Sequence, residues 1–181
     1  MTASPSTLDL DNALWRFALP FYARDGVSPA CLTLQDQLGV DVNVLLLAIF
    51  AQVERGIMLD ESDLATADSV VRDWRSEVIQ PLRRVRTRMK AGPAPAPSPS
   101  TEPLRDRIKA AELEGEQIAL AMLAAWLDAQ PARPASATAD PKHVPLSVAR
   151  HFHAGAFSAD VEAALETLLR ATREARAAQP T

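Results

Sequence analysis

The sequence predicts an all-α protein: a helical bundle with a central apolar helix, a long kinked helix and a linker-connected helical C-terminal region. Two observations favour this class. No stretch shows the sustained polar and apolar alternation, bounded by hairpin turns, that is typical of strands. Apolar residues instead recur at spacings of three and four between residues that start and stop helices. With 181 residues, 48% of them hydrophobic and 23% charged, the chain is long enough for one ordinary core.

The first two helices are expected within residues 11–39. The first occupies residues 11–26 and stops at Gly26, with a bend at the proline inside it. The second begins with Ser28 as N-cap and Pro29 at its first helical position. Gly39 is expected to end it in the left-handed conformation that glycine adopts readily.

The third predicted helix is the most apolar part of the chain. Asp41 is the expected N-cap, since its carboxylate can accept from the amides of Asn43 and Val44, and Gly56 is the expected stop. The eight residues 44–51 are all apolar and cover every side of the helix, as in a helix surrounded by neighbours. Because a bilayer span needs roughly 18 to 20 apolar residues, this pattern predicts a core helix and no membrane segment.

A long helix is expected next, from the N-cap Asp60 to Lys90. Its predicted apolar stripe, with spacings of three and four, is Leu64, Ala67, Val71, Trp74, Val78, Leu82, Val85 and Met89. Pro81 removes one backbone hydrogen bond and should kink the helix or split it in two.

We predict three regions in the chain. Residues 1–90 form an N-terminal helical core, and residues 91–100, with four prolines, form an extended linker. Residues 101–181 form a helical C-terminal region that contains a loose segment at 130–145. Its helices are expected to start at the caps Thr101 and Ser158.

Composition restricts the partners and the compartment. The net charge of −4 gives no global attraction to nucleic acid or anionic lipid. The single cysteine, Cys31, excludes an intramolecular disulfide and a multi-thiolate zinc site, and suits a reducing compartment. The N-terminus lacks the basic start and apolar run of a secretory signal, so we expect a cytoplasmic protein.

Common catalytic motifs are missing from the sequence. It has no phosphate-binding loop, dinucleotide fingerprint or nucleophile elbow, and only six glycines. His143, His151 and His153 have no known metal-ligand spacing, so we interpret them as surface or capping residues. Cys31 is interpreted as a small buried residue. We therefore predict no catalytic residue, metal site or cofactor, and favour a protein that is not an enzyme.

One polar group of residues has two interpretations. Gln35, Asp36, Asp41 and Asn43 lie within nine residues and bracket the turn at Gly39. Carboxylates and amides that converge at such a corner could bind a ligand. Alternatively, Asp41 caps a helix, Asn43 is satisfied in the first turn, and Gln35 and Asp36 stabilise the corner.

A basic cluster is the second candidate site. The residues Arg83, Arg84, Arg86 and Arg88 lie in a segment, Arg72 to Lys90, with seven basic and two acidic residues. This segment could bind an acidic protein. Nucleic acid is possible but disfavoured, because the chain is acidic and has no recognised binding motif. A third reading is that the arginines are solvated or pair with glutamates at 112–116 of the same chain.

The stretch "LWRFALPFYARDGVSPACLTLQDQLGVDVNVLLLAIFAQ" resembles a family of small proteobacterial proteins in the domain-of-unknown-function series. The shared pattern, "LW.F....Y...GV...CL.LQD..G.DVN.LL", runs from Leu14 to Leu46, and the resemblance as a whole covers roughly the first 90 residues. The resemblance implies no particular activity. It does place Gln35, Asp36, Asp41 and Asn43 inside the shared pattern, which favours a role for this corner.

The leading hypothesis from the sequence is a non-enzymatic helical interaction or adaptor protein with a protein partner or a second copy of itself. It depends on the long amphipathic stripes and the missing catalytic motifs. The alternative is an enzyme or small-ligand binder with its site at the Gln35–Asn43 corner, and a third possibility is nucleic-acid binding through the arginine segment.

Overall fold

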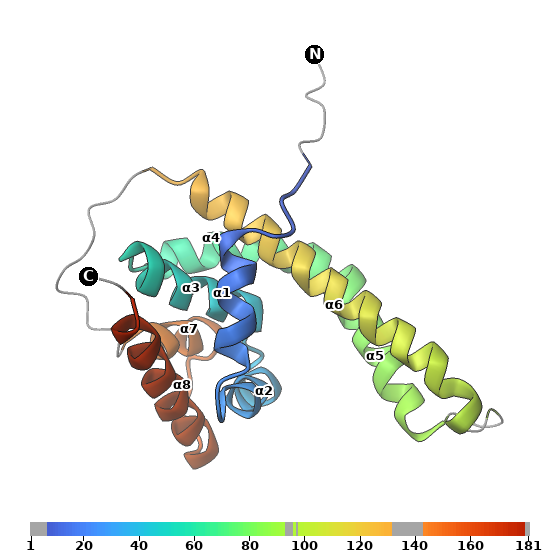
Figure 1. The fold of residues 1–181 in the computed structure, drawn as a ribbon. Coiled ribbons are helices and arrows are strands. Elements are labelled where there is room, and N and C mark those ends of the chain that lie inside the picture. Colours follow the sequence, from blue (N-terminus) through green and yellow to red (C-terminus); the bar gives the residue numbers. More distant parts are fainter. Residues whose placement is uncertain (1–6, 93–95, 97, 132–142, 180–181) are drawn as a thin grey trace.

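The computed structural model describes residues 7–92, 96, 98–131 and 143–179, and every regular element in these ranges is helical. The all-α prediction is therefore confirmed (Figure 1). The elements in chain order are α1 Ala13–Tyr22, α2 Val27–Leu38, α3 Val42–Arg55, α4 Glu61–Trp74, the π-helical η1 Arg75–Ile79, α5 Gln80–Arg88, the 3₁₀-helical η2 Met89–Ala91, α6 Ser98–Asp128, α7 Val144–Phe152 and α8 Ala159–Ala177.

Helix α3 is the centre of the hydrophobic core. Every residue from Asn43 to Val53 is buried, because α1, α4, α6, α7 and α8 all contact this helix. Asp41 caps it, with its carboxylate accepting from the amides of Asn43 at 2.7 Å and Val44 at 3.2 Å. Gly56, with φ of 64°, ends it. The predicted limits and burial of the central helix are confirmed.

The predicted start of the second helix is wrong by two residues. Helix α2 begins at Val27, and Gly26, with φ of 75°, precedes it in a left-handed conformation. The amide of Ala30 donates to the carbonyl of Gly26 at 3.1 Å, so the helical hydrogen bonds begin before Ser28 can act as a cap. Gly39, with φ of 73°, ends α2 as predicted.

Pro81 interrupts the long helix through a π-helical turn, η1. The amide of Gln80 donates to the carbonyl of Arg75, five residues earlier, and the chain then continues as α5. One extra residue in the turn rotates everything after it by about 100° relative to a regular α-helix. Ile79 is therefore buried, whereas Val85 is 47% exposed, and the predicted stripe is wrong at Val85.

The C-terminal part differs from the prediction in two places. Helix α6 begins at Ser98, before the expected cap Thr101, so the end of the predicted 91–100 linker is helical. Helix α7, Val144–Phe152, was not predicted, because its nine residues follow directly on a proline-rich stretch. Most of the predicted loose segment, residues 132–142, lies outside the described residues. Ser158 caps α8 as predicted.

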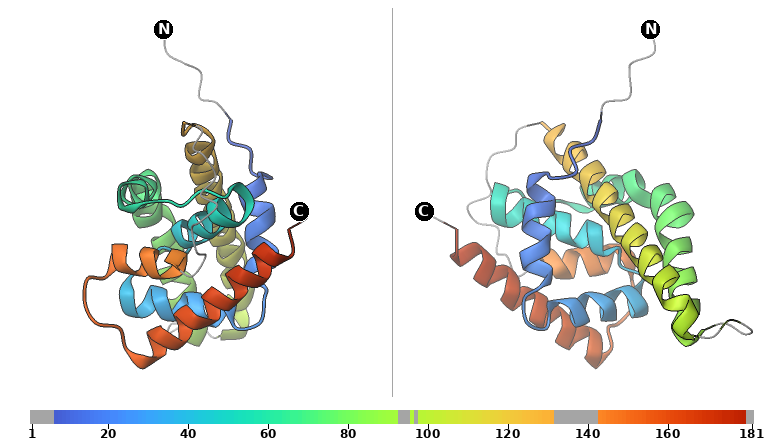
Figure 2. Two further views of the ribbon diagram at one scale, coloured as in Figure 1. Left: turned by 90° about the vertical axis from the view of Figure 1, so that its left-hand side faces the viewer. Right: turned by 45° about the vertical axis from the view of Figure 1, so that its right-hand side comes forward.

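The helices form one core and one projection. Buried side chains of α1 to α4 and α6 to α8 belong to a single hydrophobic cluster, in which α8 lies against α2, and α7 lies against α3. We call this part the body. The first half of α6, residues 98–112, pairs with α5 and extends beyond the other helices (Figures 1 and 2). We call α5, η2 and residues 98–112 of α6 the arm.

Candidate functional site

The Gln35–Asn43 corner lies where α2 ends and α3 begins. Gly39 closes α2 by donating its amide to the carbonyls of Gln35 and Leu34, and Val40 enters the core. The turn is short because Gly39 adopts the left-handed conformation, so Gln35 and Asp36 of one helix lie close to Asp41 and Asn43 of the next.

Asp41 does more than cap α3. Its second carboxylate oxygen accepts from the guanidinium of Arg75 at 2.6 Å, and the same nitrogen of Arg75 donates to Asp68 at 2.8 Å. Burial alone would raise the pKa of Asp68, but Arg75 and Arg72 outweigh it and hold that pKa below its usual value. The capping residue is thus also the buried end of a row of alternating charges, Asp41, Arg75, Asp68 and Arg72, whose other end is exposed.

Asn43 joins the corner to α6. Its side-chain amide donates to the carboxylate of Glu116, which also accepts from Arg83 at 2.5 Å. Burial raises the pKa of Glu116, and the nearby negative charges of Asp41 and Glu112 add to this effect. The hydrogen bond from Asn43 and the charge of Arg83 act against it without cancelling it. Glu116 is therefore easier to protonate than an ordinary glutamate.

Arg83 connects three elements. Its guanidinium donates to Gln35 at 2.7 Å, to Glu112 at 2.9 Å and to Glu116. Glu112 also accepts from Arg86, at 3.2 Å through one nitrogen and by a second bond through another. The two arginines hold the pKa of Glu112 below its usual value despite its burial. This network fixes α5 against both α2 and α6.

The π turn places the two central arginines on one side of their helix. In a regular α-helix, residues eight apart, such as Arg75 and Arg83, differ by about 80° around the axis. Because η1 accommodates one additional residue, the difference falls to about 20°. Both side chains can then reach the corner, Arg75 at Asp41 and Arg83 at Gln35.

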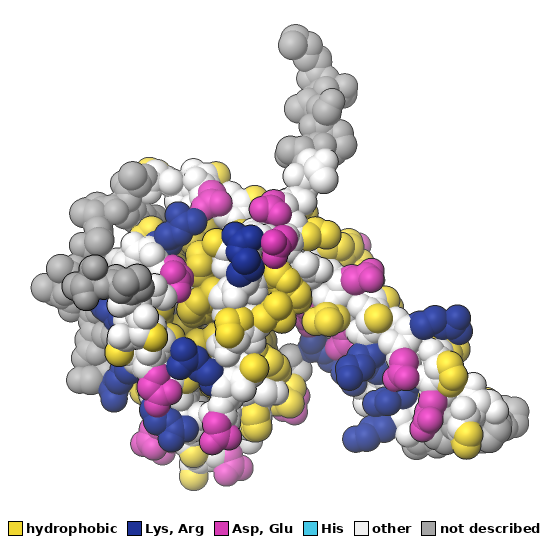
Figure 3. Space-filling view, in the orientation of Figure 1, with side chains coloured by type: hydrophobic (Ala, Val, Ile, Leu, Met, Phe, Trp, Pro, Cys, Tyr) yellow, Lys and Arg dark blue, Asp and Glu magenta, His cyan; other side chains and the backbone are white. Residues whose placement is uncertain are grey.

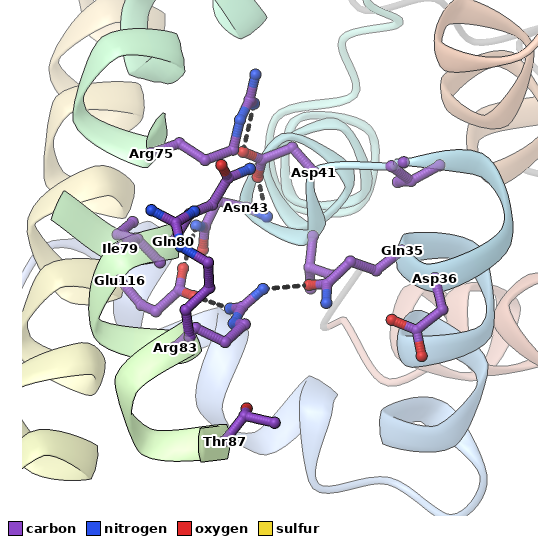
Figure 4. A pocket seen from close by; sticks show the side chains of 14 residues that line it. Gln35, Asp36, Asp41, Asn43, Arg75, Ile79, Gln80, Arg83, Thr87 and Glu116 are labelled. Carbon is purple, nitrogen blue, oxygen red and sulfur yellow. Dashed lines mark hydrogen bonds and ion pairs between the residues drawn. The ribbon is translucent and has the colours of Figure 1, made fainter. Parts of the chain in front are cut away.

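These residues line a cavity of about 570 Å³, which we call the corner cavity (Figure 4). It is bounded by the end of α2, the turn at Gly39, the start of α3, η1, α5 and Glu116 of α6. The lining residues are Gln35, Asp36, Gly39, Val40, Asp41, Val42, Asn43, Arg75, Ile79, Gln80, Arg83, Arg84, Thr87 and Glu116.

The lining contains two kinds of polar side chain. The first kind is hydrogen-bonded or ion-paired with other lining residues or with their neighbours: Gln35, Asp41, Asn43, Arg75, Arg83 and Glu116. The second kind makes no hydrogen bond or ion pair with any residue that the structure describes: Asp36, Gln80, Arg84 and Thr87. In Figure 4, Asp36 lies on α2, across the cavity from Thr87, and no dashed line reaches it.

The structure brings all four corner residues of the sequence analysis to one cavity, but in different roles. Asp41, Asn43 and Gln35 belong to the wall network, whereas Asp36 is exposed at the rim. Of the basic cluster, Arg83 and Arg86 pair within the chain, and Arg84 and Arg88 are exposed and unpaired among the described residues. Sequence reasoning did not connect Arg75 or Glu116 to the corner.

The other reactive side chains lie elsewhere. Burial raises the pKa of the Cys31 thiol to about 12, so this residue is a protonated core residue at neutral pH. Within the described ranges, no three His, Cys, Asp or Glu side chains are grouped so that they could hold a metal ion. None of the described helices is both long and apolar enough to span a bilayer.

Comparison with known proteins gives a family for this chain. No curated protein and no solved structure matches it. The model of one family, described as "Protein of unknown function (DUF2390)", matches residues 13–140, which include the corner, the arm and α3. This match covers more than half of the sequence, and the chain therefore belongs to the DUF2390 family.

Proposed function

We propose that the protein binds a small zwitterionic molecule of the amino-acid or short-peptide class in the corner cavity. The observation that carries this proposal is the pair of unpaired charges at the cavity, one of each sign. Asp36 extends from α2 and Arg84 from α5, and neither has an ion-pair partner among the described residues.

The ionic network behind these two residues supports a prepared site. Arg75 and Arg83 are each held by at least two partners, so the wall is ordered before any ligand arrives. A wall that is already fixed lowers the entropic cost of binding. The volume of about 570 Å³ falls in the range of roughly 300 to 1,000 Å³ that is common for small-molecule sites.

The free side chains have complementary roles. The Asp36 carboxylate can accept hydrogen bonds from a ligand ammonium group. The Arg84 guanidinium can donate two parallel hydrogen bonds to a ligand carboxylate, with the Thr87 hydroxyl as a further donor. The Gln80 amide can both donate and accept, which suits a peptide group or a polar side chain.

Isothermal titration calorimetry with the single amino acids and a set of dipeptides tests this proposal. Inorganic phosphate, acetate and ethylamine serve as probes that carry charge of only one sign. We expect measurable binding of at least one zwitterion. Asp36→Asn and Arg84→Gln should each weaken that binding by about tenfold or more, because each removes a charge-assisted hydrogen bond.

Matched control variants are Asp73→Asn on α4 and Arg170→Gln on α8, which remove exposed charges away from the cavity. They should leave the affinity unchanged. Binding of phosphate or acetate in place of every zwitterion, or equal affinities for Asp36→Asn and the unmodified protein, would overturn the proposal.

A further inference from the structure

The arm carries a concentration of positive charge on an otherwise acidic chain. Residues 80–112 contain eight Lys or Arg and three Asp or Glu, although the whole chain has a net charge of −4. Figure 3 shows Lys and Arg side chains gathered on the arm where it extends from the body. Eight basic residues less three acidic residues leave a formal charge of +5 on the arm, and such an excess on a projecting element attracts partners of the opposite sign.

Internal pairing accounts for only part of this charge. Arg83 and Arg86 are neutralised by Glu112 and Glu116, so they are not available to a partner. Arg105 is half-buried. The other basic residues of the arm outside the corner cavity are exposed and make no hydrogen bond or ion pair with any residue that the structure describes: Arg88, Lys90, Arg107 and Lys109.

Apolar side chains accompany these cations. Val85 is 47% exposed and Leu104 is 46% exposed, so each offers apolar surface that a partner could cover. Val85 is three residues before Arg88, and Leu104 is three residues before Arg107, so each apolar side chain neighbours a cation on its helix surface. Arg83 and Thr87 line the corner cavity, and Val85, midway between them, points away from it.

This composition fits a protein partner better than a nucleic acid. Residues 75–125 contain no aromatic side chain, so the arm has no platform on which bases could stack. The pairing of cations with exposed aliphatic residues matches instead a helix that carries acidic and apolar residues on one face. The acidic partner is selected by charge and held by apolar burial.

We propose that the arm is a docking surface for an acidic amphipathic segment of a partner protein. The apolar face of the segment lies on Val85 and Leu104, and its carboxylates pair with Arg88 and Arg107, each three residues further along the same helix. This surface shares no residue with the unpaired groups Asp36, Arg84, Gln80 and Thr87, so either proposal can fail without the other.

Fluorescence anisotropy with a designed peptide tests the docking surface. The probe is a labelled amphipathic helix of Leu, Ala and Glu, and the comparison probes are a scrambled peptide of the same composition, polyuridylate and vesicles of phosphatidylglycerol. We expect the amphipathic peptide to bind more tightly than each comparison probe. Raising the salt concentration should weaken binding without abolishing it, because the apolar contact is not screened.

Two double variants separate the apolar contribution to peptide binding from the ionic contribution. The pair Val85→Ser with Leu104→Ser and the pair Arg88→Gln with Arg107→Gln should each weaken peptide binding by about tenfold or more. Leu19→Ser with Arg170→Gln, which alters exposed residues of the body, is the matched control and should have no effect. All six positions are exposed, and unchanged melting temperatures check that the variants remain folded.

Three results would overturn the proposal. One is equal binding of the scrambled and amphipathic peptides, which would indicate charge attraction alone. Another is tighter binding of polyuridylate or vesicles than of the peptide. The third is an unchanged affinity in the Val85→Ser, Leu104→Ser variant.

Discussion

The body and the arm are both helical, but they are stabilised in different ways. In the body, α3 buries eleven consecutive residues, from Asn43 to Val53, most of them apolar. In the arm, α5 has no buried residue and is fixed to its neighbours through Arg83, Arg86 and Glu112. Apolar burial involves no titrating group and no charge that salt can screen, whereas ion pairs respond to both pH and ionic strength. The same secondary structure therefore leads to regions that should respond differently to perturbation.

The largest effect is expected from Leu47→Ala in the body. Leu47 is fully buried on α3, and removal of its side chain leaves a cavity that the packed neighbours cannot fill. We expect a loss of about 3 to 5 kcal/mol in the free energy of unfolding, measured by urea denaturation. Leu19→Ala, at a position that is 49% exposed, is the control and should change stability by less than about 1 kcal/mol.

An intermediate effect is expected from Glu112→Gln in the arm. The substitution keeps the shape of the side chain but removes the charge that Arg83 and Arg86 share. We expect the local stability of the arm to fall by about 1 to 3 kcal/mol. Hydrogen exchange measures this loss as faster exchange of α5 amides while α3 amides remain protected. The neighbouring Glu114→Gln is the control, since Glu114 is exposed. Equal exchange in α3 and α5 would contradict the division into body and arm.

Acid should weaken the ion pairs of Asp68 on α4 and Glu112 on α6 before it affects the apolar core around α3. The pKa values of Asp68 and Glu112 lie below their usual values, so the folded state binds fewer protons than the unfolded state. The stability they contribute is present above the ordinary carboxyl pKa of about 4 and is lost as the pH falls below it. The indole of Trp74 donates to the carbonyl of Gly115 at 2.9 Å, so its NMR resonance reports the contact between α4 and α6.

We expect the Trp74 indole resonance to shift only below about pH 4, because the lowered pKa values of Asp68 and Glu112 place their protonation below the ordinary carboxyl range, while methyl resonances of α3 stay in place. A variant with Glu112→Gln should show a smaller shift, because one of the two carboxyls no longer titrates. Simultaneous loss of both sets of signals would indicate that the contact between α4 and α6 and the core around α3 are lost together.

The smallest effect, with the opposite sign, is expected from Glu116→Gln. Burial raises the pKa of Glu116, so the folded state binds more protons here than the unfolded state, and stability rises as the pH falls toward the ordinary glutamate value. A neutral glutamine removes this cost and can still accept from Asn43. We expect the free energy of unfolding of the variant at pH 7 to equal that of the unmodified protein or to exceed it by up to about 1 kcal/mol, measured by urea denaturation. A loss of stability as large as that expected for Glu112→Gln would contradict the conclusion that burial of the Glu116 charge costs stability.

Local interactions were predicted from the sequence with success. Asp41 caps α3 by accepting from amides two and three residues later, and Gly39 and Gly56 end their helices. Each of these features depends on a few consecutive residues, whose hydrogen bonds and backbone preferences are the same in any fold. The apolar residues 44–51 likewise indicate a core helix whatever surrounds it.

The sequence did not reveal which face of α5 is buried. A continuous α-helical period assigned Val85 to the buried stripe, yet the π turn at Arg75–Ile79 rotates α5 and exposes it. The position of Pro81 indicates an interruption but not its form, because a kink, a break and a π turn all leave the proline amide position without a hydrogen bond.

The sequence by itself determined the helical class, the central helix and the caps at the corner. Only the tertiary structure decided what the corner faces. Gln35 binds Arg83, 48 residues away, and Asn43 binds Glu116, 73 residues away, across helices whose packing sets the distance. Periodicity places a side chain on one face of its own helix. Which partner meets that face depends on the packing of the whole chain, and here it joins α2, α3, α5 and α6 around one cavity.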